Sequence, residues 1–175
     1  IDAAQSIRAA LKEKGQTLTD DMIETVDVGV YQASIDVCDR INPTTEYEAK
    51  FSLHHTVAAG LLCDTVDFSA FGEEARSNLQ PARVKVRPSL EEPYASAYPR
   101  AWGSSVTLTL KSGEIIAETR AHAKGDPEAA LSREEMISKA TMLLNHAQTQ
   151  EPTRFIDAVL ALADDGQLPA LPEGF

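Results

Sequence analysis

Two periodicities of hydrophobic residues divide this chain into expected strands and expected helices. Apolar and polar residues alternate through 26–30, and again through 104–110 and 114–122 on either side of a turn at 111–113. A period of two places alternate side chains on one face of a strand, so these segments predict a half-buried strand and a β-hairpin. A further short strand is expected over Arg83–Arg87, where valines alternate with basic residues.

Helices are expected where apolar residues recur every three or four positions. Ser52, and Ser132 together with Glu135, are capping residues that mark where two of these helices begin. The predicted helices cover 2–14, 31–40, 53–63, 72–78, 132–146 and 152–165. The segments predicted to lack regular structure are a polar linker at 44–49, a proline-containing loop at 90–100 and a tail at 167–175.

The order of these elements predicts an α+β fold, because the strands follow neither strict βα alternation nor an all-β series. We expect a small, mostly antiparallel sheet with a hairpin, covered by several helices. No internal repeat or low-complexity segment interrupts the chain. Residues 1–175 are therefore expected to form a single domain.

Composition narrows the classes of protein that fit this domain. The 175 residues are 43% hydrophobic, which is enough for one globular core. They include 27 acidic and 16 basic residues, a net charge of −11, and such a surface disfavours binding to nucleic acid. No apolar run reaches the roughly 20 residues of a membrane-spanning helix, so no membrane association is expected.

The cysteines and the start of the chain indicate its setting. Cys38 and Cys63 lie in apolar stretches without a CxxC spacing, and we interpret them as reduced thiols of a cytoplasmic protein. No metal site is expected, because the histidines and cysteines show no ligand spacing. The chain begins at Ile1 without a Met or a signal-peptide pattern, so we expect a piece of a longer protein.

The segment from Lys50 to His55 carries the most reactive combination of residues. If Ser52 caps a helix, the free N–H groups at its start attract anions, and Lys50 adds a full positive charge. The same field favours neutral His54 and His55 side chains that can accept a proton. This combination suits a carboxylate substrate. The competing interpretation is a solvated helix cap without a function.

A second basic feature is the row formed by Arg83, Lys85 and Arg87, which a strand would place on one face. Arg83 and Lys85 are candidates for binding a polycarboxylate. The alternative, which we favour, is an edge strand whose charges discourage aggregation. His122 and His146 are expected to be structural or exposed.

Two segments resemble motifs of the MmgE/PrpD family. Residues 48–62, EAKFSLHHTVAAGLL, are similar to the helix start of that family with its AKFS sequence. Residues 124–135, KGDPEAALSREE, followed by Lys139, are similar to a second family stretch, although Ala140 stands where an aromatic residue is typical. Both motifs occur in the expected order, and the resemblance covers 24–165.

The resemblance implies an activity and a domain arrangement. The family comprises 2-methylcitrate dehydratases, cis-aconitate decarboxylases and iminodisuccinate epimerases, in which an active site lies between a helical N-terminal domain and a smaller α+β lid. This chain resembles the C-terminal lid alone. The implied chemistry is proton abstraction next to a carboxylate of a small di- or tricarboxylate, without a metal or organic cofactor. The KFS sequence favours the wider branch of the family over a 2-methylcitrate dehydratase.

Carried onto this sequence, the residues that the lid contributes are Lys50, to pair with a substrate carboxylate, and His55, to carry a proton or bind a carboxylate. Ser52 and His54 are secondary candidates for substrate binding, and His54 has no family counterpart. The implied partners are a small polycarboxylate, the absent helical domain and a second copy of the complete protein. The chain alone is expected to be inactive. The alternative is a non-catalytic acidic module that binds another protein.

Overall fold

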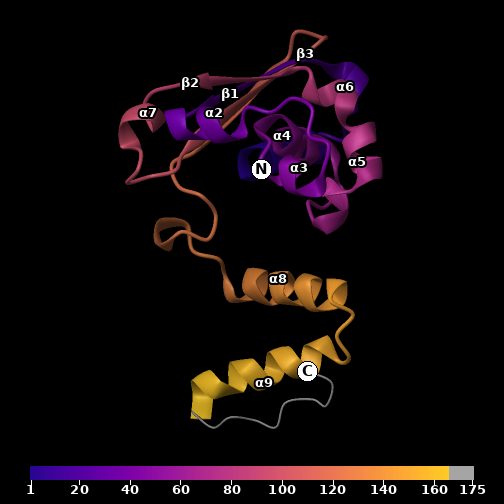
Figure 1. Cartoon of the computed structure of the whole chain (residues 1–175), viewed down its shortest axis with the longest axis vertical. Helices are drawn as coiled ribbons and strands as arrows, with labels where there is room; N and C mark the ends of the chain where they lie inside the picture. Colours follow the sequence, from indigo (N-terminus) through magenta and orange to yellow (C-terminus); the bar gives the residue numbers. More distant parts are fainter. Residues whose placement is uncertain (166–175) are drawn as a thin grey trace. The chain divides into compact units, whose positions relative to one another are not determined.

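The computed structural model describes residues 1–165 of this chain, which divides into two compact units, Ile1–Ala129 and Ala130–Phe175. The first unit holds the sheet and most of the helices, and the second holds a pair of helices (Figure 1). The elements of each unit follow from local sequence signals and from the apolar faces that these elements bury.

The sheet of the first unit has the strand order β2-β1-β3-β4 within the described residues. Its strands are β1 (Ile23–Val30), β2 (Val86–Leu90), β3 (Ser104–Leu110) and β4 (Ile115–Arg120). β1 pairs with β2 in parallel, whereas the β1–β3 and β3–β4 pairs are antiparallel. The fold is α+β as predicted, but the sheet is mixed rather than mostly antiparallel. A long connection between β1 and β2 returns the chain to the edge of the sheet at which β1 begins. β2 therefore runs in the same direction as β1.

A row of apolar residues crosses all of these strands and forms the centre of the core. The register places Val86, Val26, Leu108 and Ile116 side by side, and Val26 and Leu108 are completely buried. Helices α1 (Asp2–Glu13) and α4 (Leu53–Leu62) contact each other, and they also contact strands of the sheet (Figure 1). The apolar residues that alternate along the strands and those that recur with the helical period therefore pack into one hydrophobic cluster.

The connection between β1 and β2 contains a series of short helices. In chain order they are α2 (Gln32–Cys38), α3 (Glu46–Lys50), α4, η2 (Phe68–Phe71), α5 (Glu73–Asn78) and α6 (Gln80–Arg83). Outside this connection the first unit also contains η1 (Asp20–Met22), α7 (Tyr94–Ala97) and η3 (Pro127–Ala129). Every candidate site residue lies on the β1–β2 connection.

Three predictions about local structure were wrong. The expected linker at 44–49 contains α3, and the expected loop at 90–100 contains α7. The expected strand Arg83–Arg87 is displaced, because Arg83 ends α6 and β2 begins only at Val86. Leu79 and Ala82 are buried, so the apolar residues that decide this segment follow a helical spacing into Arg83.

The hairpin and the long helices were predicted correctly. Strands β3 and β4 flank the turn at 111–113, where Gly113 has φ +90°. The Ser52 side chain caps α4 as expected, whereas Asp2 is the first helical residue of α1 and not its cap. The hairpin and α4 thus follow from local signals that the core reinforces.

The second unit consists of α8 (Arg133–His146) and α9 (Pro152–Asp165), which pack against each other (Figure 1). Ser132 and Glu135 form the predicted capping box. Met136 and Leu143 of α8 have exposed fractions of 52% and 43%. The tail predicted over 167–175 lies outside the described residues.

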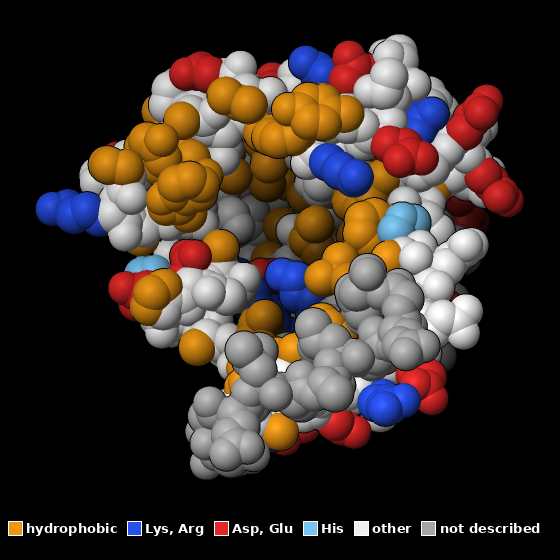
Figure 2. All heavy atoms as spheres, turned by 60° about the horizontal axis from the view of Figure 1, so that its bottom comes forward, with side chains coloured by type: hydrophobic (Ala, Val, Ile, Leu, Met, Phe, Trp, Pro, Cys, Tyr) orange, Lys and Arg blue, Asp and Glu red, His pale blue; other side chains and the backbone are white. Residues whose placement is uncertain are grey.

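The surface carries both signs of charge. On the face shown in Figure 2, Asp and Glu side chains are spread among Lys and Arg side chains, with hydrophobic groups between them. The excess of negative charge is therefore not concentrated at one site of this face. A search of the described residues found no helix that combines the length and apolarity needed to span a membrane.

The central position of Leu108 gives a test of the fold. We expect Leu108→Ala to lower the free energy of unfolding by about 2–5 kcal/mol, because a completely buried side chain leaves a cavity. Thr109→Ala, at the next position of the same strand and on the opposite face, is the matched control, with an expected loss of about 1 kcal/mol or less. Urea unfolding followed by circular dichroism measures both values, and equal losses would contradict this core.

Candidate functional site

Lys50 lies at the junction between α3 and α4. The Thr45 hydroxyl caps α3 by accepting a hydrogen bond from the Glu48 amide at 3.1 Å, and completely buried Ala49 fixes the helix to the core. Lys50 is the last residue of α3, where a positive charge interacts favourably with the helix dipole. Lys50 is exposed, so its side chain can meet solvent.

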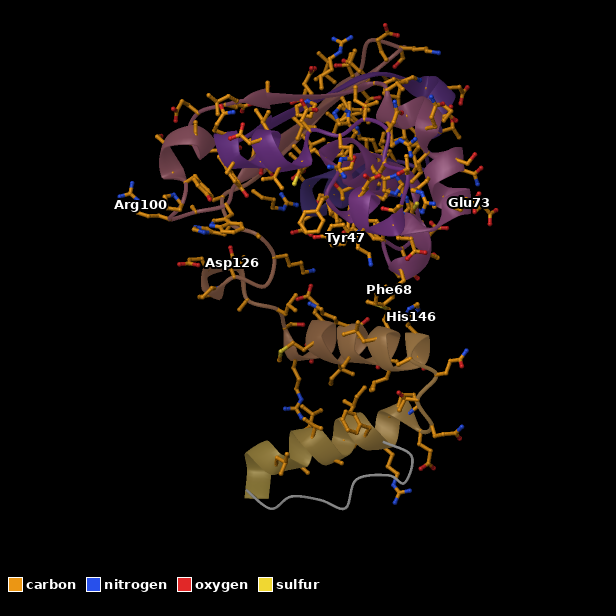
Figure 3. The ribbon with its side chains drawn as sticks, viewed as in Figure 1. Tyr47, Phe68, Glu73, Arg100, Asp126 and His146 are labelled. Carbon is orange, nitrogen blue, oxygen red and sulfur yellow. The ribbon has the colours of Figure 1, made fainter. Side chains whose placement is uncertain are left out.

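The surroundings of Lys50 are aromatic rather than acidic. Its Nζ atom lies 5.6 Å from the centre of the Phe68 ring. The centres of the neighbouring Tyr47 and Phe51 rings lie 4.9 Å apart. The two residues are 70% and 41% exposed. Tyr47 and Phe68 project from the same side of the first unit (Figure 3). Since Lys50 forms no ion pair with a carboxylate of the described residues, its charge is available to an anion.

Ser52 forms the start of α4 through its side chain. Its hydroxyl accepts a hydrogen bond from the His55 amide at 3.0 Å and donates one to the Arg40 carbonyl at 2.6 Å. Only 1% of the residue is exposed. These contacts confirm the predicted cap, and they show that Ser52 ties α4 to the segment after α2 instead of facing solvent.

His54 is buried between a carboxylate and a backbone carbonyl. Its Nε2 atom lies 2.7 Å from Asp39 Oδ1, and its Nδ1 atom lies 3.3 Å from the Arg83 carbonyl oxygen. The residue is 2% exposed, whereas the Asp39 side chain is 46% exposed. His54 therefore links the start of α4 to the end of α6, and Asp39 is the member of this group that meets solvent.

His55 is completely buried, and both of its ring nitrogens have partners. Nε2 donates a hydrogen bond to the Ala70 carbonyl at 2.7 Å, which leaves Nδ1 to accept from Arg83 Nη1 at 3.4 Å. Burial is the main cause that lowers the pKa of His55, and the charges of Arg83 and Arg76 lower it further. The lowered pKa favours the neutral imidazole, and its main cause is burial, whereas the prediction relied on the field of the helix start.

Arg83 and Lys85 do not form the predicted basic row. Arg83 is 5% exposed and donates a hydrogen bond to the Arg76 carbonyl at 2.6 Å, while its buried Nε atom has no hydrogen-bond partner among the described residues. Burial lowers the pKa of Arg83, and the charge of Arg76 adds to this effect. The Lys85 ammonium donates to the carbonyls of Asp20 and Ile23 at 2.6 and 2.9 Å. Both cations therefore serve internal contacts: Arg83 ends α6, and Lys85 lies in the turn between α6 and β2.

Lys50 and His55, the two residues that the family resemblance assigns to the site, do not lie on one exposed face of the structure. The ammonium group lies at the surface, whereas the imidazole is enclosed in the core. The two residues instead contact the same short turn, η2. Lys50 lies over the ring of Phe68 at one end, and His55 binds the Ala70 carbonyl at the other end. Both residues therefore contact η2, but only Lys50 lies at the protein surface.

Sequence reasoning missed Phe68, Asp39 and the helix that carries Lys50. A signal for α3 was present, because Thr45 followed three residues later by Glu48 is the sequence of a capping box. Nothing in the local sequence indicates that Asp39 reaches His54 or that Phe68 reaches Lys50, because these contacts join separate segments. Across the described part of the chain, no three His, Cys, Asp or Glu side chains come together as a metal site.

The buried state of His55 gives a prediction about pH. The folded-state pKa of His55 is lowered, so its contribution to stability is present above the unfolded value of about 6.5 and is lost as the pH falls through the folded value. We expect the protein to lose more stability than His55→Gln between about pH 7.5 and 5.5, by on the order of 1 kcal/mol. Urea unfolding of both proteins at each pH measures this difference, and parallel pH profiles would contradict it.

Comparison with known protein families identifies the family of this chain. A search of curated proteins found no match. The family model described as the MmgE/PrpD C-terminal domain matches residues 1–164, which is nearly the whole chain. That family is one of dehydratases and other lyases. The chain therefore belongs to the MmgE/PrpD family, as its C-terminal domain.

Proposed function

We propose that this chain is the C-terminal part of a lyase or isomerase that acts on a small di- or tricarboxylate. The proposal combines family membership with the chemistry of the α3–α4 junction. The reaction type is removal of a proton next to a carboxylate, followed by loss of water, loss of carbon dioxide or reprotonation. No cofactor takes part in the proposed reaction, and the complete protein is proposed to act as a homodimer in the cytoplasm.

The observation that carries this proposal is the exposed Lys50 ammonium, which has an aromatic neighbour and no carboxylate partner among the described residues. Removing a proton next to a carboxylate spreads negative charge over the enolate that forms. A fixed positive charge stabilises that developing charge more than it stabilises the substrate, which lowers the barrier. In this role Lys50 binds a substrate carboxylate and stabilises the transition state.

The proposed role of His55 is indirect, because its ring is completely buried whereas Lys50 is exposed. Both ring nitrogens are in use, so transferring a proton to substrate would require the ring to leave the Ala70 carbonyl and Arg83. Geometry therefore favours His55 as a residue that holds α4 and η2 together. We assign the base that removes the proton to the helical N-terminal domain.

A binding module without catalysis is the second candidate, and one surface feature favours it. The rings of Tyr31 and Tyr98 stack at 4.5 Å, and Trp102 lies about 6 Å from each, with 56% of its surface exposed. Exposed aromatic residues are frequent at protein interfaces. A gene that encodes an upstream helical domain supports the enzyme, whereas an unrelated upstream domain supports the module.

Lys50 provides the direct test of the proposed enzyme. In the complete protein we expect Lys50→Ala to lower kcat at least about a hundredfold with cis-aconitate or 2-methylcitrate, as loss of one positioned electrostatic group does. Lys12→Ala, which removes an exposed charge from α1, is the matched control and should leave turnover unchanged. Steady-state kinetics measure both variants. Normal turnover by Lys50→Ala would remove this residue from the site.

The domain requirement gives a separate prediction. We expect the chain of residues 1–175 alone to turn over neither cis-aconitate nor 2-methylcitrate, because its His55 imidazole is enclosed in the core and the proposed base belongs to the helical domain. Adding the separately produced helical domain should restore activity. Turnover by the isolated chain would show that catalysis does not need the second domain.

A further inference from the structure

The proposed site requires the Lys50 ammonium to stay in one position. A lysine side chain has four rotatable carbon–carbon bonds, and an exposed one samples many rotamers unless a contact selects among them. A catalytic charge that wanders over several ångströms loses most of its effect on the transition state. Some group in the structure is therefore expected to hold the ammonium.

The recorded contact of this ammonium is the face of Phe68. The distance of 5.6 Å from Nζ to the ring centre falls within the range of about 6 Å in which a cation is attracted to an aromatic face. Tyr47 and Phe51, the other rings near Lys50 in sequence, contact each other. Phe68 comes from a different segment, so it can fix the position of the ammonium relative to the rest of the first unit.

Hydrogen bonds at both ends of η2 fix the turn from which Phe68 projects. Asp67 caps this turn, and its Oδ1 atom accepts hydrogen bonds from the Ser69 amide at 2.8 Å and the Ser69 hydroxyl at 2.6 Å. These bonds lower the pKa of the Asp67 carboxyl, which keeps it ionised as an acceptor. At the other end of the turn, Phe71 is buried and the Ala70 carbonyl binds His55. The ring of Phe68 therefore projects from a turn anchored at both ends.

We propose that Phe68 is a positioning residue that holds the Lys50 ammonium ready for a substrate carboxylate. This inference rests on the proposed function of Lys50. A carboxylate partner would also hold the ammonium, but it would neutralise the charge and would have to be displaced by the substrate. An aromatic face attracts the cation through the ring quadrupole and carries no net charge. The ammonium thus keeps its charge and its N–H donors for the substrate.

The contact can be measured without any activity. Reductive methylation with ¹³C-formaldehyde labels the lysines of the chain and retains their charge, and Lys50→Arg identifies the Lys50 signal. We expect the Lys50 methyl protons to resonate upfield of the other lysines because of the Phe68 ring current. Phe68→Leu should remove this shift and Phe68→Tyr should keep it. Phe71→Leu alters the same turn without touching Lys50 and should leave the signal in place.

The consequence for catalysis is tested in the complete protein with cis-aconitate and 2-methylcitrate. Replacing Phe68 with mono-, di- and trifluorinated phenylalanine weakens the attraction for a cation stepwise while the ring keeps nearly the same shape. We expect kcat/KM to fall stepwise along this series, to a loss of about three- to tenfold. A role limited to packing would give no such gradient.

The outcomes are separable. An unshifted Lys50 methyl signal, or a fluorinated series with constant kcat/KM in an enzyme that needs Lys50, overturns the positioning role of Phe68. If Lys50→Ala leaves turnover unchanged, the proposed function itself fails, and the inference about catalysis fails with it. In that case the methyl signal still decides whether Phe68 holds the ammonium.

Discussion

Two imidazoles, a hydroxyl and a guanidinium are buried where α4 begins, and burying each of them costs free energy unless it finds partners. Ser52 bonds both to the His55 amide and to the Arg40 carbonyl, while the two histidines bond to groups from three other segments. These bonds determine how the α3–α4 junction sits against η2 and α6. The position of Lys50 follows from them, because this residue ends the helix that enters the junction.

At this junction, the residues that hold the segments of the chain together are different from the residue that can meet a ligand. A reactive site often uses the same residues for both. The buried histidines join segments of the chain, and their hydrogen bonds are internal. The charge that can meet a ligand stands outside, on Lys50, next to aromatic rings. Such a division keeps the histidines in internal contacts, while Lys50, which forms no ion pair within residues 1–165, stays exposed on a chain with a net charge of −11.

Much of this arrangement could be predicted from the sequence, and the remainder depended on contacts between distant segments. The Ser52 cap, the hairpin and the Ser132–Glu135 capping box are local signals, and the structure contains all of them. The burial of His55 was not predictable, because the carbonyl and guanidinium that satisfy its ring come from η2 and α6. The segment around Arg83 was misjudged for a related reason: two valines suggested a strand, but burial of Leu79 and Ala82 favours a helix.

The parallel pairing of β1 with β2 has a consequence for how this domain can vary. Parallel neighbours require a long excursion between them, and here that excursion carries α2 through α6. Its two ends are fastened by strand pairing, and α4 packs into the core, so only its exposed segments can change in length and sequence without altering the order of the sheet. Changes in length are therefore expected in the exposed turns of this connection, while the strands and α4 stay constant.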